Sequence, residues 1–439
     1  MPSLDRFASA RVRSARRPGR RGVRPGARRG AVLLAAGAIL AAGLSGCVAG
    51  APEPAATTAA PPAVATPTAP SIDPGPAAAL EFPAVGAGAV GIASADGSVE
   101  VLGQGGETGT VPIASITKVI TSLVVLDAHP LAGPGDPGPT ITLGAADLER
   151  TEAIEATGQF VEPMFEGQQV TLHDALAITL LTSANNYAET AASWAFGSTD
   201  AYLEAARAWL AEQGLTGTTL ADASGLDPGS ASTTADLLRV GALAHADPAL
   251  AAIAGLASYD QPDLGTIVNQ NVLLGEGGVD GLKTGSTTYA GATLLTSAVV
   301  TVGSSPVTLI AVVLGTESID ARFATTRALL ASAQAGLREV RLATAGQSFG
   351  SYGLAATGTA SPGTASSDTA SPGADSPESA DAVATADLSA VVFGDTPITT
   401  EVRLEPRTTG AAGDPTGTAA FTVGTARYEV PLALATPLG

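Results

Sequence analysis

Apolar and polar positions follow strand-like and helix-like periods in different parts of this 439-residue chain. A β-hairpin is predicted first, with strands over residues 90–94 and 99–102 joined by a turn at Asp96-Gly97. An apolar run at 119–126 then predicts a helix over 115–127 that is buried on nearly all sides. Regular structure therefore begins near Val90.

Helical periodicity dominates residues 144–247. The pattern predicts helices over 172–182, 185–196, 200–212 and 235–245, with Ser198, Thr233 and Thr234 as candidate N-caps. The period then changes to short β-branched runs at 281–286, 292–302 and 307–315, followed by a helix over 319–336. This order predicts an α+β fold in which an antiparallel sheet, flanked by helices, carries an all-helical insert.

Two segments are too poor in large apolar residues to form a core. Residues 48–79 are mostly Ala, Pro and Thr and predict an extended tether. Residues 355–386 combine Ser, Thr, Pro, Ala and Gly with acids, and disorder is expected there. A small all-β module is predicted from strands at 388–393, 398–404, 419–423 and 427–434, with 346–352 as a candidate member.

The N-terminus has the pattern of an export signal. Ten arginines and one acid, Asp5, occupy the first 30 residues, and an apolar run covers 31–44. Leu44-Ser-Gly-Cys47 matches the lipobox of bacterial lipoproteins, which predicts a signal peptide over 1–46 and lipidation of Cys47. An uncleaved signal anchor is the alternative, although ~14 apolar residues are short for a membrane span. Both readings put the protein outside the cytoplasm on the cell membrane, and neither decides between the general and twin-arginine export routes.

The charge balance changes once the leader is removed. Taking its ten arginines and one aspartate from 22 basic and 41 acidic residues leaves 12 against 40, a net near −28. So acidic a body argues against nucleic acid as a partner and against electrostatic docking to anionic lipid. Cys47 is the only cysteine, so no intramolecular disulfide forms, and no His/Cys cluster predicts a metal or another cofactor.

Three short motifs indicate the chemistry. They are Ser115-Ile-Thr-Lys118, Ser183-Ala-Asn185 and Lys283-Thr-Gly285, with their first residues 68 and then 100 positions apart. Each motif alone is weak evidence for a function, because S-x-x-K arises by chance, S-x-N often caps a helix and a lone KTG is an ordinary turn. In this order they predict an active-site serine acyltransferase.

A serine hydroxyl is a poor nucleophile at neutral pH and needs a base within hydrogen-bond reach. Lys118 follows Ser115 by one helical turn, so both side chains are expected on one face. The lysine must be neutral to accept a proton, and burial together with the nearby cation of Lys283 would lower its pKa toward working pH. Ser115 is thus the candidate nucleophile and Lys118 the candidate general base.

The other two motifs supply positioning groups. Ser183 and Asn185 are expected to pass a proton to the leaving group and to orient the substrate peptide bond. Lys283 would anchor a substrate carboxylate, assisted by the hydroxyls of Thr284 and Thr287.

The strand that carries the third motif is rich in glycine. Gly285 lies at its edge, where another backbone can approach closely. The backbone N–H groups of Ser115 and Ser286 are the candidate oxyanion hole.

With these motifs the chain resembles the low-molecular-mass penicillin-binding proteins that act as D-alanyl-D-alanine carboxypeptidases. The resemblance runs from about residue 90 to 333. It includes four further blocks, Ile113–Thr121, Ala223-Ser-Gly-Leu-Asp227, Asn269–Leu274 and Ala290-Gly291.

The resemblance implies a β-lactamase/transpeptidase-like domain over 81–340, preceded by the lipidated linker at 47–80 and followed by a β module over 341–439. It also implies release of the terminal D-alanine from peptidoglycan stem peptides through a Ser115 acyl-enzyme, and acylation of Ser115 by β-lactams. Two positions depart from the family pattern. Asn186 stands where members often have Asp, and Ser286 stands where they usually have a bulky ring, which predicts a more open pocket.

Two other functions share these motifs. A serine β-lactamase would need a deacylating carboxylate near Ser115, for which Glu162 and Glu166 are candidates. A non-catalytic wall-peptide-binding protein is disfavoured by the intact motif residues. His129, His173 and His245 are scattered and are interpreted as structural.

Overall fold

The structure is a computed structural model that describes residues 63–107, 109–353 and 379–439. The predicted signal peptide, Cys47 and the first part of the linker lie outside this described part. Within it, no single helix has both the length and the apolar character that crossing a membrane requires. Helices α6 (Thr234–Ala246) and α7 (Pro248–Ala254) together pass that test by length and composition, but they meet at a bend of 101°.

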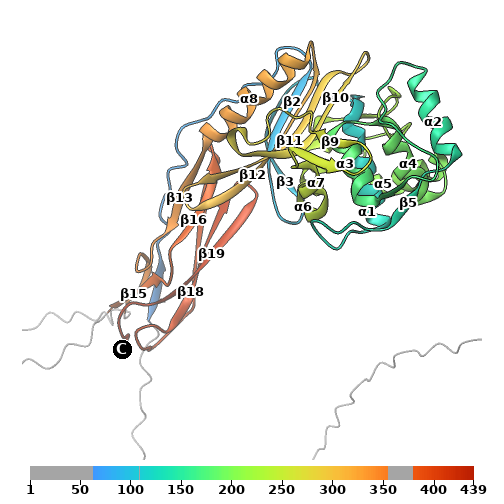
Figure 1. Cartoon of the computed structure of the whole chain (residues 1–439). Helices are drawn as coiled ribbons and strands as arrows, with labels where there is room; N and C mark the ends of the chain where they lie inside the picture. The colour runs from blue at the N-terminus through green and yellow to red at the C-terminus, as the bar shows by residue number, and fades with distance from the viewer. Residues whose placement is uncertain (1–62, 108, 354–378) are drawn as a thin grey trace, which may run out of the picture. The chain divides into compact units, whose positions relative to one another are not determined.

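A five-stranded antiparallel sheet forms the centre of the catalytic region (Figure 1). Its strand order is β10-β11-β12-β2-β3, so β10 and β3 are the edge strands. The bounds are β2 (Ala87–Ala93), β3 (Val99–Gly106), β10 (Val279–Thr287), β11 (Gly291–Val302) and β12 (Ser305–Thr316). These strands confirm the hairpin and the three β-runs expected from the sequence.

Both faces of this sheet are covered by helices, which explains why its inner strands β2, β11 and β12 are largely apolar. Alternate residues of a strand point to opposite faces. Leu309 and Val313 of β12 pack with Phe323 of helix α8 (Ile319–Gly336), whereas Ile310 and Val312 join the core that contains helix α6. Helices α8 and α6 therefore cover opposite faces.

The helical region holds the helices that the pattern predicted, together with two that it did not, α2 and α7. Its helices are α1 (Thr117–Ala128), α2 (Ala145–Glu155), α3 (Leu172–Leu181), α4 (Asn185–Phe196), α5 (Thr199–Glu212), α6 (Thr234–Ala246) and α7 (Pro248–Ala254). Ser198 and Thr233 cap α5 and α6 by accepting backbone N–H groups, as expected.

The region is not purely helical, because short two-stranded ladders accompany the helices. The ladders join β4 (Val111–Pro112) to β7 (Ala231–Ser232), β5 (Thr140–Thr142) to β6 (Gln169–Thr171), and β8 (Ser258–Gln261) to β9 (Gly265–Val268).

The C-terminal part is a β module with its own core. Its strands are β13 (Leu337–Ala343), β14 (Ser348–Gly353), β15 (Ser379–Ala384), β16 (Leu388–Phe393), β17 (Ile398–Leu404), β18 (Pro415–Val423) and β19 (Ala426–Leu434). The predicted disorder over 355–386 lies outside the described residues as far as 378, and it is wrong for β15. There Ala380, Ala382 and Ala384 alternate into the module core, so small residues suffice to define a strand.

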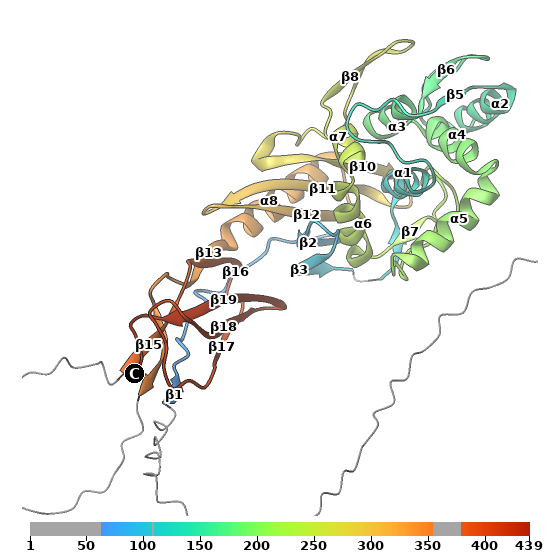
Figure 2. The same cartoon turned by 90° about the horizontal axis from the view of Figure 1, so that it is seen from below.

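The segment after residue 62 is also structured, contrary to the prediction of a free linker as far as residue 80. Strand β1 (Val64–Pro67) pairs antiparallel with β14 and completes a sheet of order β1-β14-β15-β19-β18-β17 (Figure 2). Ala63 donates its N–H to the carbonyl of Arg407 at 3.0 Å, and further along Leu80 and Phe82 pack against the core beneath α8. Strand pairing uses backbone groups, so the Ala/Pro/Thr composition did not reveal it.

Candidate active site

The three motifs come from distant parts of the chain and converge at one end of β10. Ser115 lies in the 3-10 turn η1 (Ala114–Ile116) that leads into α1, and Lys118 lies in the first turn of α1. Ser183 and Asn185 lie where α3 gives way to α4, and Lys283 lies within β10. The structure thus brings all five of these predicted residues to one region.

Lys118 is at the centre of the site. Its Nζ lies 2.9 Å from Ser115 Oγ, 2.7 Å from Asn185 Oδ1 and 2.7 Å from the backbone carbonyl oxygen of Ser224. The side chain is fully buried, and burial lowers its pKa from the ordinary lysine value to about 7. The charges of Asp222 and Glu189 act in the opposite direction and limit the shift. Lys118 therefore has the position and the basicity of a general base for Ser115.

Strained backbone occurs directly before Ser115 and at Ser183 itself. Ala114 has φ 49° and Ser183 has φ 69°, and they are the only non-glycine residues with positive φ in the described part of the chain. Such conformations cost about 1–3 kcal/mol each and persist where the surrounding structure imposes them. Asn185 is held in addition by Phe160, whose carbonyl oxygen accepts the Asn185 Nδ2–H at 2.7 Å.

Strand β10 approaches the nucleophile very closely at Gly285. A Cβ at this position would lie 3.0 Å from the Ser115 backbone nitrogen and 2.5 Å from Thr293 Oγ1. Only glycine therefore fits without a shift of the strand or of the turn. Because β10 pairs with β11 alone, its other edge is open beside Ser115.

Lys283 is buried directly behind this edge. Within the described chain its Nζ has no hydrogen-bond partner. Burial, reinforced by the positive charges of Lys118 and Arg322, holds the pKa of Lys283 well below its ordinary value. Its neighbours Thr284, Gly285 and Ser286 line the cavity in front of Ser115.

That cavity has a volume of about 170 Å³ and includes residues that the motifs did not predict. Arg322 of α8 reaches it and donates from Nη1 to the carbonyl of Gly285 at 3.1 Å; burial lowers the pKa of Arg322 to about 10. The remaining lining residues are Gln159, Phe160, Ser183, Asn185, Leu226, Gln270 and Ile319. Gln270 and Leu226 belong to sequence blocks already singled out, whereas no motif pointed to Arg322 or Phe160.

Some predicted residues lie elsewhere. Thr287 is not among the residues that line the cavity, and its hydroxyl accepts the N–H of Ala290 at 3.1 Å. Glu162 lines a separate groove beside α2, and Glu166 is exposed. Neither is among the residues that line the Ser115 cavity.

The three histidines have local partners of their own. His129 packs against Trp194 with tilted rings, His173 lies against Tyr259, and His245 Nδ1 lies 3.7 Å from a carboxylate oxygen of Asp280. Within the described ranges no group of three or more His, Cys, Asp or Glu residues could hold a metal ion.

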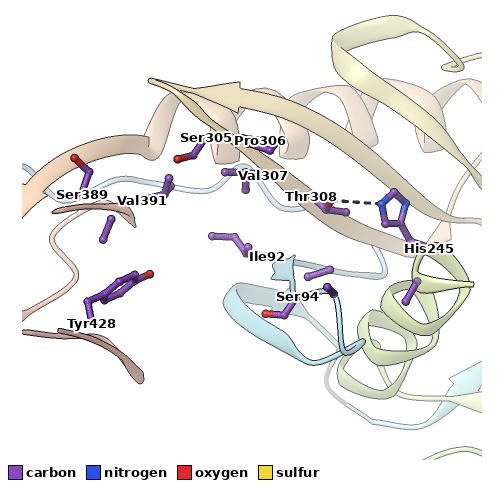
Figure 3. Close-up of a pocket in the computed structure, with 14 residues that line it drawn as sticks. Ile92, Ser94, His245, Ser305, Pro306, Val307, Thr308, Ser389, Val391 and Tyr428 are labelled. Carbon is purple, nitrogen blue, oxygen red and sulfur yellow. Dashed lines mark hydrogen bonds between the residues drawn. The ribbon is translucent and has the colours of Figure 1, made fainter. Parts of the chain in front are cut away.

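A larger cavity, of about 590 Å³, lies away from the motifs (Figure 3). Its walls come from β2, α6, β12, β16 and β19, and His245 and Thr308 face each other across 3.4 Å within it. None of the motif residues lines it. The chemistry therefore identifies the smaller cavity as the candidate active site.

Comparison with known proteins agrees with this site. The family model described as D-alanyl-D-alanine carboxypeptidase matches residues 79–318, more than half of the chain. The chain belongs to this family. All three motifs fall within the matched range, as do the residues that line the cavity apart from Ile319 and Arg322.

The sequence identity to individual members of the family is low. The chain is 32% identical over 242 residues to the D-alanyl-D-alanine carboxypeptidase DacC of Escherichia coli, which covers 53% of this chain and 58% of that protein. It is 29% identical over 259 residues to DacD of Salmonella typhimurium, covering 57% and 64%. The chain thus spans about three fifths of the length of the curated relatives it matches.

Solved structures share the fold over a larger part of the chain. Penicillin-binding protein 5 of Haemophilus influenzae is similar with a TM-score of 0.54 and 19% identity, over 85% of this chain and 99% of that one. PBP3 of Streptococcus pneumoniae gives 0.57 and 20%, over 81% and 99%. These likenesses confirm the predicted combination of a transpeptidase-like domain with C-terminal strands.

Proposed function

We propose that this chain is a serine-type D-Ala-D-Ala carboxypeptidase, which removes the terminal D-alanine from peptidoglycan stem peptides through an acyl-enzyme on Ser115. The observation that carries the proposal is the 2.9 Å contact between Ser115 Oγ and the buried amine of Lys118, whose pKa is lowered to about 7. Membership of the carboxypeptidase family supports the choice of substrate.

Acylation follows from the donors and acceptors around Lys118. When its amine is neutral, the two N–H groups donate to Asn185 Oδ1 and the Ser224 carbonyl, and the lone pair accepts the Ser115 hydroxyl proton. Ser115 Oγ then bonds to the carbonyl carbon of the penultimate D-alanine. The C–N bond breaks, and the departing amine takes a proton from the Lys118 ammonium, with Ser183 in the cavity wall as the relay.

The substrate binds along the open edge of β10. An extended peptide at this edge pairs with backbone groups and brings its scissile carbonyl to the N–H groups of Ser115 and Ser286. Its terminal carboxylate meets Arg322 and the Thr284 hydroxyl, with the Lys283 amine behind them. Desolvation makes these charge-assisted contacts stronger than they would be in water.

Deacylation by water completes the cycle and separates this proposal from a β-lactamase. Rapid hydrolysis of a β-lactam adduct needs an added carboxylate beside the acyl bond. In the described structure the cavity wall contains no Asp or Glu, and Glu162 lines a different groove, with its backbone N–H donating to Asn186 Oδ1 at 3.2 Å. This supports slow deacylation, so that β-lactams act as covalent inhibitors.

The proposal also includes export and attachment to the cell membrane through a lipidated Cys47. The support is the arginine-rich leader, the apolar run and the Leu-Ser-Gly-Cys sequence. A substrate in the cell wall requires an enzyme outside the cytoplasm. Labelling with radioactive palmitate and its loss in Cys47→Ala tests this part, and an unlabelled wild-type protein in the membrane fraction would contradict lipidation.

The activity is tested by D-alanine release from a pentapeptide that ends in D-Ala-D-Ala. The protein starting at residue 48 is expected to release D-alanine, and Ser115→Ala is expected to release none. The same peptide ending in L-Ala is the control for stereochemistry. A folded wild-type protein that leaves the peptide intact would overturn the proposal, and rapid turnover of a β-lactam by that sample would indicate the lactamase instead.

A further inference from the structure

The third acceptor of the Lys118 amine comes from a loop with no assigned role. The first two, Ser115 Oγ and Asn185 Oδ1, belong to the motifs. The third is the backbone carbonyl of Ser224, at 2.7 Å. In the neutral amine, the two carbonyl acceptors together decide where the lone pair points, so the position of the Ser224 carbonyl determines whether it points at the Ser115 hydroxyl.

Two carboxyl groups hold this loop, the half-buried Asp222 and the buried Glu189. Asp222 accepts the N–H groups of Gly225 at 2.9 Å and Leu226 at 2.7 Å. Glu189, from the second turn of α4, accepts the N–H of Ala223 at 3.0 Å, directly before the residue whose carbonyl receives the Lys118 bond. Asp222 also accepts the hydroxyls of Ser224 and Ser230.

The loop that contains Ser224 also packs closely against the turn that carries Ser115. Gly225 has φ +81°, and a Cβ there would lie 1.9 Å from the carbonyl oxygen of Ala114. The loop, the Ser115 turn and α4 therefore form one packed unit around the amine. A displacement of the Ala223 N–H would move the Ser224 carbonyl with it.

Glu189 stands out because it is a carboxyl group inside the protein, with 8% of its surface exposed. Burial, followed by the charge of Asp222, raises its pKa, while the Ala223 and Ser224 hydrogen bonds and Arg150 lower it. The hydrogen bond from the Ala223 N–H needs only an acceptor oxygen, and the side-chain amide of glutamine would supply one equally well. An acid at this position therefore adds a charge to the surroundings of Lys118.

We propose that Glu189 is a positioning residue for the Ser115 reaction: together with Asp222 it fixes the loop whose Ser224 carbonyl orients the Lys118 amine, and its carboxylate adds to the charges that act on that amine. The inference rests on the proposed function of Ser115 and Lys118. It names a residue outside the three motifs.

The charges around the amine determine the sign of the expected effect. Lys118 is faced by Asp222 and Glu189, which stabilise its ammonium form, and by Lys283, whose own pKa is lowered in part by Lys118. The charge of Arg150 acts on Glu189 and lowers its pKa. Replacing Glu189 with glutamine keeps the acceptor and removes one stabilising charge, so the ammonium is favoured less and Lys118 stays neutral to lower pH.

The test is the pH profile of Ser115 acylation by a fluorescent penicillin, measured on the chain from residue 48. Glu189→Gln is expected to move the acid limb to lower pH by about half a unit or more and to reduce the plateau rate several-fold, since a weaker base accepts the proton less readily. Glu189→Asp keeps the charge but shortens the side chain. The acid limb of its pH profile should therefore coincide with that of the wild type, while its plateau rate should fall. Glu204→Gln, exposed on α5, is the matched control with an unchanged profile.

Asp222→Asn provides a second variant should Glu189→Gln fold poorly. The acid limb of its pH profile is also expected to move to lower pH. Profiles of the folded variants that superimpose on the wild type in both limb and plateau would overturn the inference. Using a penicillin separates this result from the proposed function. Acylation without D-alanine release would contradict the carboxypeptidase and leave the test of Glu189 intact, whereas a wild type that is not acylated would overturn both.

Discussion

Protonation of Lys118 should switch off acylation over a pH range that an ordinary lysine would not show. With a pKa of about 7, the amine is neutral in ~50% of molecules at pH 7, ~90% at pH 8 and ~1% at pH 5. Because Ser115 needs the neutral amine, the acylation rate constant should rise about tenfold per pH unit below 7 and level off above 8. The burial of the Lys118 side chain, which opposes its charge, is the cause of this window.

The assay is the second-order rate constant for acylation by a fluorescent penicillin between pH 5 and 9.5. Circular dichroism at each pH shows whether the protein stays folded, so that loss of rate is not loss of structure. A rate that continued to rise tenfold per unit up to the highest pH of this range would mean an unperturbed lysine, with an ordinary pKa of ~10.4, and would refute the reasoning. A rate independent of pH would exclude Lys118 as the base.

Three further predictions concern the walls of the site and the N-terminal segment. Gly285→Ala should reduce acylation by ~10²-fold without unfolding the protein, because the new Cβ would displace the Ser115 turn; unchanged kinetics would mean that the strand moves freely. Arg322→Gln should raise KM for the peptide by ~10- to 100-fold through loss of a charged hydrogen bond, with Arg322→Lys between the two; an effect on kcat alone would place the carboxylate elsewhere. The protein starting at residue 68 should have a free energy of unfolding ~1–3 kcal/mol below that of the protein starting at residue 48, because the β1–β14 pairing is lost. Equal urea midpoints would show that this pairing contributes nothing.

The sequence predicted the parts of the site that depend on local rules. Ser115 and Lys118 are one helical turn apart, so their contact follows from spacing alone. The apolar runs at 292–302 and 307–315 correspond to β11 and β12, because strands buried on both faces have nearly continuous apolar sequences. Capping residues such as Ser198 likewise act within their own helix.

Contacts between segments that are distant in the sequence could not be predicted from local sequence patterns. Arg322 reaches the cavity from α8, and Phe160 presents only a backbone carbonyl to Asn185, which any residue type would supply. The burial of Glu189 depends on how α4 packs on the 222–227 loop, and charge alone suggests an exposed residue. For the same reason strand β1 was missed, because its pairing with β14 uses backbone groups in a sequence with the composition of a linker.

The central claim is that Ser115 is the residue that carries the acyl group, and it is tested most directly by locating that group. The protein is treated with benzylpenicillin, its intact mass is measured, and the modified peptide is sequenced by mass spectrometry. One added penicilloyl group per chain on Ser115, absent from Ser115→Ala, is the result that the arrangement of Ser115 and Lys118 predicts. A folded wild-type protein that gains no mass, or an adduct on any other residue, would contradict it.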